Sequence, residues 1–184
     1  MLLNKKIKSN ILSKTIDVDD RKIGLEVECF IYNKDFKRIP VNQASEYSAS
    51  DLLSELSKNI NNNGNFSLEP GGQLEWSSPP YRDIKDLEIS LLSYKRLLDK
   101  ILKKRGLRSL YIGVDPFYDP ENIDLISQKK YQLMNKNMEK KDILGKWMMR
   151  NTSSIQINYD IVDEKDLEEI MFIADCIHPV SSYL

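Results

Sequence analysis

Residues 23–32 decide the fold, and they read Ile-Gly-Leu-Glu-Val-Glu-Cys-Phe-Ile-Tyr. Side chains alternate between the two faces of a β-strand, so the odd-numbered residues of this stretch form one apolar face. The even-numbered residues form the other face, which carries Glu26 and Glu28. Burying neighbouring carboxylates without a partner costs on the order of several kcal/mol each. A divalent cation held by both carboxylates is the simplest compensation.

The composition limits the classes of protein to which the chain can belong. Its 184 residues are 41% hydrophobic, which is enough to build the core of one domain. The 27 basic and 28 acidic residues nearly cancel, which argues against nucleic acid or a membrane as a partner. The first residues lack the apolar stretch of a signal peptide or a membrane span, so we expect a cytoplasmic protein.

The hydrophobic pattern predicts both helices and strands. Apolar residues recur every three or four positions in segments that we predict to be helices, namely 50–60, 83–105, 129–138 and 164–177. Shorter segments have the pattern of strands, namely 66–68, 73–77, 107–114 and 149–160. We therefore expect an α+β fold, with a largely antiparallel or mixed sheet and helices on one of its faces.

Local signals mark several ends of these elements. Asp83 can cap the amino end of the long helix, and Gly106 follows its carboxyl end. Pro70, Gly71 and Gly72 supply the fixed and the permissive backbone angles that a tight turn between two strands requires.

Polar residues gather on one face of the predicted sheet. In the last strand the even-numbered residues from Thr152 to Asp160 are polar, and Gln73 and Glu75 likewise share a side. The candidate metal ligands are four carboxylates near strand ends, namely Glu26, Glu28, Glu69 and Glu75. Magnesium takes a few such oxygens and completes its shell with water and phosphate oxygens. The competing interpretation is an ordinary solvated sheet face.

The order of the motifs along the chain adds a second line of argument. They are residues 23–28, the stretch Leu-Glu-Pro-Gly-Gly-Gln-Leu-Glu at 68–75, Tyr131 with Met134, and residues 148–158. In this order they resemble the glutamate-cysteine ligases of the plant and proteobacterial type, which are carboxylate-amine ligases of the glutamine synthetase-like superfamily. The resemblance implies an amino-terminal extension at 1–21. It also implies that 22–184 form the amino-terminal part of a glutamine synthetase-like catalytic fold, incomplete at its carboxyl end.

The resemblance also implies a reaction. Such enzymes join the γ-carboxylate of glutamate to the amino group of cysteine through a γ-glutamyl phosphate, in the first step of glutathione synthesis. They use ATP as a substrate and Mg²⁺ as a cofactor. Rate enhancement then comes from positioning and electrostatics, and we assign no side chain as a catalytic acid or base.

Site residues are carried over position by position. Glu26, Glu28, Glu69 and Glu75 look like the magnesium ligands. The residues that look like substrate contacts are Lys130, Arg150, Thr152 and Ser154. Gln156 and Asn158 look like contacts to the nucleotide or the metal. The chain has Lys130 and Asn151 at positions where many relatives have arginine, and neither residue can grip a carboxylate through two parallel hydrogen bonds.

Two other functions remain open at this stage. One is a related ligase that uses another amine in place of cysteine. The other is a fragment without catalytic activity that binds metal or a partner chain. In either case we expect a complementary chain or a missing carboxyl-terminal half to complete the sheet, so the activity of the isolated chain stays open.

Overall fold

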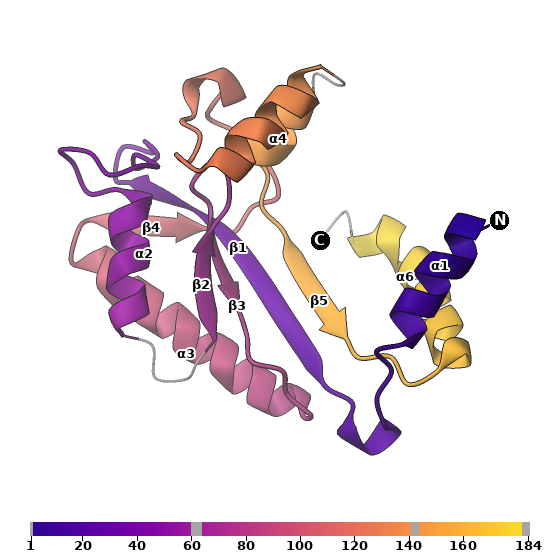
Figure 1. Ribbon diagram of the computed structural model, residues 1–184. Coiled ribbons are helices and arrows are strands. Elements are labelled where there is room, and N and C mark those ends of the chain that lie inside the picture. The colour runs from indigo at the N-terminus through magenta and orange to yellow at the C-terminus, as the bar shows by residue number, and fades with distance from the viewer. Residues whose placement is uncertain (1, 60–63, 141–143, 182–184) are drawn as a thin grey trace.

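Strand β1 (Ile23–Asn33) is the central strand of the sheet in the computed structural model, which describes residues 2–59, 64–140 and 144–181. On one edge it pairs with β3 (Leu74–Ser77). On the other edge it pairs with β5 and then β4, namely Ile155–Tyr159 and Leu107–Leu110. β2 (Asn65–Leu68) lies outside β3 (Figure 1), and every pairing is antiparallel. This arrangement confirms the predicted α+β class.

The helices are interleaved with these strands along the chain. They are α1 (Leu2–Leu12), α2 (Ala49–Lys58), α3 (Ile84–Lys103), α4 (Lys129–Glu139), α5 (Gly145–Asn151) and α6 (Glu164–Ser181). Two short 3₁₀ helices, η1 and η2, cover Val18–Asp20 and Pro120–Asn122. Helices α2, α3, α4 and α6 agree closely with the four predicted ones, whereas α1 and α5 were not predicted. The predicted end of α2 at Ile60 lies outside the described residues. The division into an extension at 1–21 and a catalytic part stays a prediction.

The core lies between the apolar face of the sheet and helices α2 and α3. Trp76 of β3 is fully buried and stacks on Tyr94 of α3, with 4.8 Å between the ring centroids. Leu98 of α3 and Leu52 of α2 are also fully buried in this cluster. Packing on one face of β1 and β3 therefore fixes which side chains those strands present on the other face.

Capping and turn residues fix the ends of the elements. Asp83 accepts a hydrogen bond from the Lys85 amide, which confirms the predicted start of α3. In the turn after β2, the Gly72 amide donates to the Glu69 carbonyl over 2.8 Å. Gly72 has a φ of 80°, a conformation that favours glycine. The turn therefore brings β3 back beside β2 with Glu69 at its start.

Two predicted strands are wrong in extent. The strand predicted at 107–114 ends at Leu110, and residues 149–151, predicted to be extended, belong to helix α5. The last carbonyls of a helix have no partner within it. Here the Arg150 carbonyl accepts from the Arg38 side chain over 2.8 Å, and the Met149 carbonyl accepts from the Gln73 side chain. Residues remote in sequence thus stabilise this short helix.

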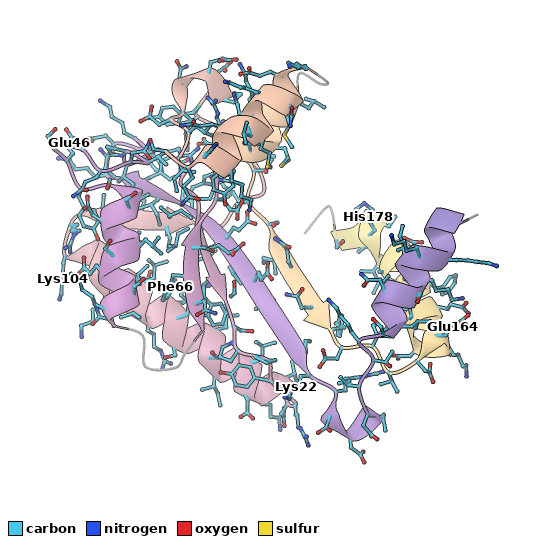
Figure 2. The ribbon with its side chains drawn as sticks, in the orientation of Figure 1. Lys22, Glu46, Phe66, Lys104, Glu164 and His178 are labelled. Atoms are coloured by element: carbon cyan, nitrogen blue, oxygen red, sulfur yellow. The ribbon has the colours of Figure 1, made fainter. Side chains whose placement is uncertain are left out.

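Helices cover only part of the apolar side of the sheet. On β5, Ile155 is 66% exposed and Ile157 is 54% exposed. Helix α6 lies beside α1 instead of beneath β5, and Glu164 at its start is paired with Lys8 (Figures 1 and 2). Cys176 on α6 is exposed, whereas Cys29 on β1 is buried.

No helix among the described residues is long and apolar enough to cross a membrane.

Core packing on α3 leads to a stability prediction. Leu98→Ala removes a fully buried side chain and should lower the free energy of unfolding by about 2–5 kcal/mol. Leu92→Ala makes the same chemical change on the same helix, but Leu92 is 44% exposed and its loss should cost less than about 1 kcal/mol. Urea unfolding followed by circular dichroism measures both. Equal losses in the two variants would contradict the described core.

Candidate active site

Three carboxylates lie together on the open face of the sheet. Glu28 of β1 is the direct register partner of Glu75 of β3, and Glu26 lies two residues earlier on β1. Register partners in an antiparallel pair project to the same face, so the prediction that these three residues share a face is confirmed. We refer to Glu26, Glu28 and Glu75 as the carboxylate face.

Strand β5 supplies hydrogen-bond donors to this face. The Ser154 amide and hydroxyl each donate to Glu28 over 3.0 Å, and the Gln156 amide group donates to Glu28 over 3.2 Å. Asn158 donates to Glu26 over 3.0 Å. The three residues predicted from the polar side of β5 are therefore in direct contact with the two carboxylates of β1.

Glu75 is held by two serine hydroxyls. Ser67 on β2 donates to Glu75 over 2.7 Å, and Ser77 on β3 donates over 3.4 Å. Ser67 is the register partner of Glu75, so the short turn between β2 and β3 places it there. Sequence reasoning missed Ser67, although the register of the predicted hairpin contained the signal.

Glu69 approaches the same face from the turn that follows β2. Burial raises the pKa of Glu69 to about 7, and repulsion from Glu75 and Glu28 adds to this effect. The positive charge of Lys130 opposes the rise. Burial and the charge of Glu75 also raise the pKa of Glu28. The hydrogen bonds from Ser154 and Gln156 act in the opposite direction, but they do not cancel the rise. The four predicted metal ligands thus form a region with surplus negative charge.

These residues fit a hard divalent cation in donor type and charge. Carboxylate and amide oxygens are the ligands that magnesium prefers. Burial is the main cause of the two raised pKa values, and a cation would relieve the repulsion between carboxylates that adds to it. Within the described ranges, however, no three acidic, histidine or cysteine side chains are gathered as a formed metal site. Glu28 instead accepts hydrogen bonds from Ser154 and Gln156, and Glu26 accepts one from Asn158. The amide groups of Gln156 and Asn158 thus present their NH2 groups, and not their oxygens, to the carboxylates of β1.

The remaining predicted contacts lie near α4 and α5. Lys130 is exposed and close enough to lower the pKa of Glu69 through its charge. The Thr152 hydroxyl donates to the Met148 carbonyl of its own helix over 2.7 Å. The Arg150 guanidinium donates to the Pro120 and Ile123 carbonyls, each over 3.0 Å. The side chains of Thr152 and Arg150 are thus engaged with the backbone, and their roles as substrate contacts stay predictions.

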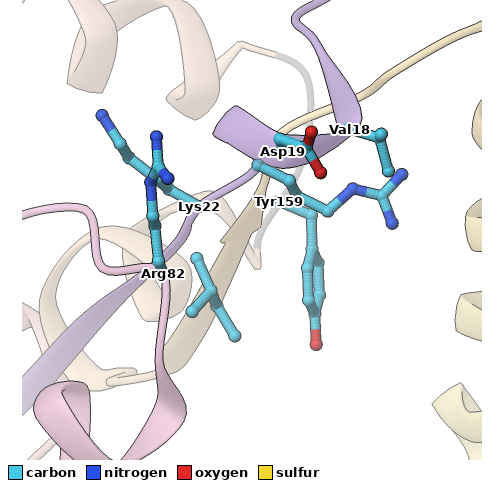
Figure 3. Close-up of a pocket in the computed structure, with 7 residues that line it drawn as sticks. Val18, Asp19, Lys22, Arg82 and Tyr159 are labelled. Atoms are coloured by element: carbon cyan, nitrogen blue, oxygen red, sulfur yellow. The ribbon is translucent and has the colours of Figure 1, made fainter.

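A cavity of about 440 Å³ lies at the amino end of β1 (Figure 3). Its walls include Ile23 and Tyr159, which are register partners on the apolar side of the β1–β5 pair. Two of its basic side chains are neutralised, because Arg82 pairs with Asp20 and Arg21 pairs with Asp166. This cavity does not open onto the carboxylate face, and we assign it no part in the site.

The amino-acid sequence matches one known protein family over most of its length. The sequence model of glutamate-cysteine ligase family 2 (GCS2) matches residues 22–184. The chain belongs to this family. Its motifs from residues 23–28 to 148–158 all lie within the matched range.

Curated members of the glutamate-cysteine ligase family show the extent of the similarity. The chain is 29% identical over 119 residues to the chloroplastic glutamate-cysteine ligases of Medicago truncatula and Arabidopsis thaliana. These matches cover 65% of this chain but only 23% of each relative. The chain is also 30% identical over 102 residues to the chloroplastic glutamate-cysteine ligase A of Oryza sativa subsp. japonica. This match covers 55% of this chain and 21% of the relative. The names place these relatives in the chloroplast, so the expected cytoplasmic location stays a prediction.

The raised pKa of Glu69 predicts a pH-dependent stability. Between pH about 4.5 and about 7, the unfolded chain releases this proton while the folded chain retains it. The folded state therefore loses stability as the pH rises through this window. Glu69→Gln cannot ionise, so its stability relative to the wild type should rise by roughly 1–2 kcal/mol between about pH 5 and about pH 8, after solvent screening. Urea unfolding at both pH values measures the difference.

A matched control is Glu46→Gln, since Glu46 is exposed in the loop before α2 (Figure 2). The stability of this variant should follow that of the wild type at both pH values. A Glu69→Gln variant that behaves in the same way would show that Glu69 is not desolvated beside the carboxylate face.

Proposed function

We propose that the chain forms the cation-binding part of a glutamate-cysteine ligase that depends on ATP and magnesium. The observation that carries the proposal is that Glu26, Glu28 and Glu75 share the open face of the sheet, where the charges of Glu75 and Glu28 also act on the half-buried Glu69. Family membership supports the reaction class. Because the matched segment spans about a quarter of the curated relatives, the activity of the whole enzyme is part of this proposal.

The proposed reaction has two steps. The γ-carboxylate oxygen of glutamate attacks the γ-phosphorus of ATP, the bond to ADP breaks, and γ-glutamyl phosphate forms. The amino group of cysteine then attacks the acyl carbon, loses a proton and displaces inorganic phosphate. The product is γ-glutamylcysteine, which places the reaction at the first step of glutathione synthesis. Negative charge accumulates on the transferring phosphoryl group, so positioning and electrostatic stabilisation carry the rate.

The residues of this chain contribute fixed charges and hydrogen-bond donors. The carboxylate face and Glu69 hold the metal, while Gln156 and Asn158 turn toward the metal or the nucleotide. Ser154 keeps Glu28 oriented through its amide and hydroxyl. Lys130, the cation that faces Glu69, is placed to attract an anionic substrate group. When bound, magnesium offsets the negative charge on the phosphate oxygens of ATP.

A related ligase with a different substrate pair is the second candidate. Its support comes from Asn151, which is fully buried and donates to the Tyr118 carbonyl over 2.6 Å. The neighbouring Arg150 is engaged by the Pro120 and Ile123 carbonyls. Neither side chain is free to grip the carboxylate of glutamate with two hydrogen bonds. A panel of acids and amines, assayed for phosphate release from ATP, separates the two candidates.

We also propose that further polypeptide completes the sheet next to β5. In the part of the chain that the structure describes, β5 pairs only with β1, and its apolar residues Ile155, Ile157 and Tyr159 are each more than half exposed. Open strand edges above an uncovered apolar face favour pairing with another strand. The added polypeptide is either a longer form of this chain or a complementary chain. Activity of this chain alone equal to that of a plant relative would contradict the proposal.

Cation binding tests the proposed function directly. Mg²⁺ titrated into the wild type by calorimetry should give a saturable signal, and ATP should tighten binding because phosphate oxygens complete the metal shell. Glu26→Gln and Glu75→Gln each remove a charged ligand and should weaken binding by about tenfold or more. Glu88→Gln is the matched control, since Glu88 is exposed on α3, away from the carboxylate face.

The control variant should bind Mg²⁺ as the wild type does. Identical binding heats in the wild type and in the Glu26→Gln and Glu75→Gln variants would instead support a solvated sheet face without a metal site.

A further inference from the structure

Arg38 lies at the junction of three segments that are far apart in the sequence. Its side chain is only 7% exposed. Nη1 donates to the Arg150 carbonyl over 2.8 Å and to Asp115 over 3.3 Å, and Nη2 donates to the Gly71 carbonyl. The guanidinium also covers the ring of Phe30, with 4.8 Å between its central carbon and the ring centroid. One planar group thus holds three chain segments at once.

Two of the three segments carry residues of the candidate site. Gly71 belongs to the turn that begins with Glu69. Arg150 lies in the last turn of α5, from which the chain passes through Thr152 to Ser154, the residue that donates to Glu28. Arg38 therefore connects the supports of Glu69 and of Ser154, although it does not contact either residue itself.

The third segment anchors the guanidinium. The Asp115 side chain is fully buried. Its carboxylate accepts hydrogen bonds from the Phe117 amide, over 2.8 Å, and from Arg38. The Asp115 amide donates to the Asn151 carbonyl over 2.8 Å. Asp115 therefore fixes the orientation of the Arg38 fork relative to the end of α5.

Backbone contact between the turn and α5 leaves little room for adjustment. A Cβ atom at Gly71 would lie 2.6 Å from both the Cα and the carbonyl oxygen of Arg150. The buried Gln73 side chain adds a second connection, because it donates to the Thr152 carbonyl over 2.8 Å. A small displacement of the turn therefore changes the position of Glu69 relative to the carboxylate face.

We propose that Arg38 is a positioning residue for cation binding, which acts by fixing the Glu69 turn against the α5–β5 junction. This inference rests on the proposed function, in which Glu69 is a metal ligand. The planar fork is required, because lysine keeps the positive charge but cannot donate to the Gly71 and Arg150 carbonyls in the same plane.

The test measures Mg²⁺ affinity by calorimetry and folding by thermal unfolding, with Mg²⁺ alone as the ligand. Arg38→Lys should weaken binding by about tenfold, as expected for a residue that orients a metal ligand. The double variant Arg38→Met with Asp115→Asn leaves no unpaired buried charge and should show at least the same loss. The matched control is Arg105→Lys, because Arg105 also combines an ion pair, with Glu55, and an aromatic contact, with Tyr47. Its affinity should equal that of the wild type.

A mutant cycle separates positioning from general destabilisation. If Arg38 acts through Glu69, Arg38→Lys should weaken binding in the wild type but should change nothing further in a Glu69→Gln background. A purely structural role predicts the same loss in both backgrounds, and that result would overturn the inference. So would wild-type affinity in Arg38→Lys. Absence of Mg²⁺ binding by the wild type would overturn the proposed function instead.

Discussion

The structure depends on the register of β1, because this strand is paired along its length with β3, β4 and β5. Alternation directs Val27 and Cys29 into the core on one side and Glu26 and Glu28 onto the open side. A slip of one residue would exchange the two faces, burying carboxylates and exposing the core. The free-energy cost of two buried, unpaired charges is comparable to the whole stability of a domain. Core packing and the arrangement of the carboxylates are therefore set by the same constraint.

Much of this arrangement could be predicted from local patterns. The two-residue period of 23–32 gave the correct faces as far as Glu28, and the three-to-four period gave α3 with Asp83 as its cap. The polar residues of β5 were predicted on one face, and Ser154, Gln156 and Asn158 do contact the carboxylates of β1. These features follow from short-range geometry, which sequence patterns describe well.

Features that depend on distant contacts could not be predicted in this way. Phe30 continues the alternation of Glu26 and Glu28, yet it is fully buried beneath Arg38. Residues 149–151 form the end of a helix, and the Arg38 and Gln73 side chains donate hydrogen bonds to the Arg150 and Met149 carbonyls, which have no partner within the helix. No periodicity in the sequence identifies either side chain as a connector, since each acts on segments about 75 to 110 residues away. The sequence likewise gives no sign that the Arg150 side chain donates to the Pro120 carbonyl, because η2 lies 30 residues earlier in the chain.

The two sides of the carboxylate face rest on supports of unequal rigidity. β3 is backed by the buried Trp76 and Leu74, whereas every residue of β5 is exposed. Local opening free energies follow such differences in burial, so β5 can fray while the remainder of the sheet stays intact. Fraying would release the carboxylates of β1 from their amide partners without any cost to the core. If a cation binds here as we propose, motion of a single edge strand is enough to exchange these internal hydrogen bonds for it, while the pairing of β1 with β3 keeps Glu28 beside Glu75.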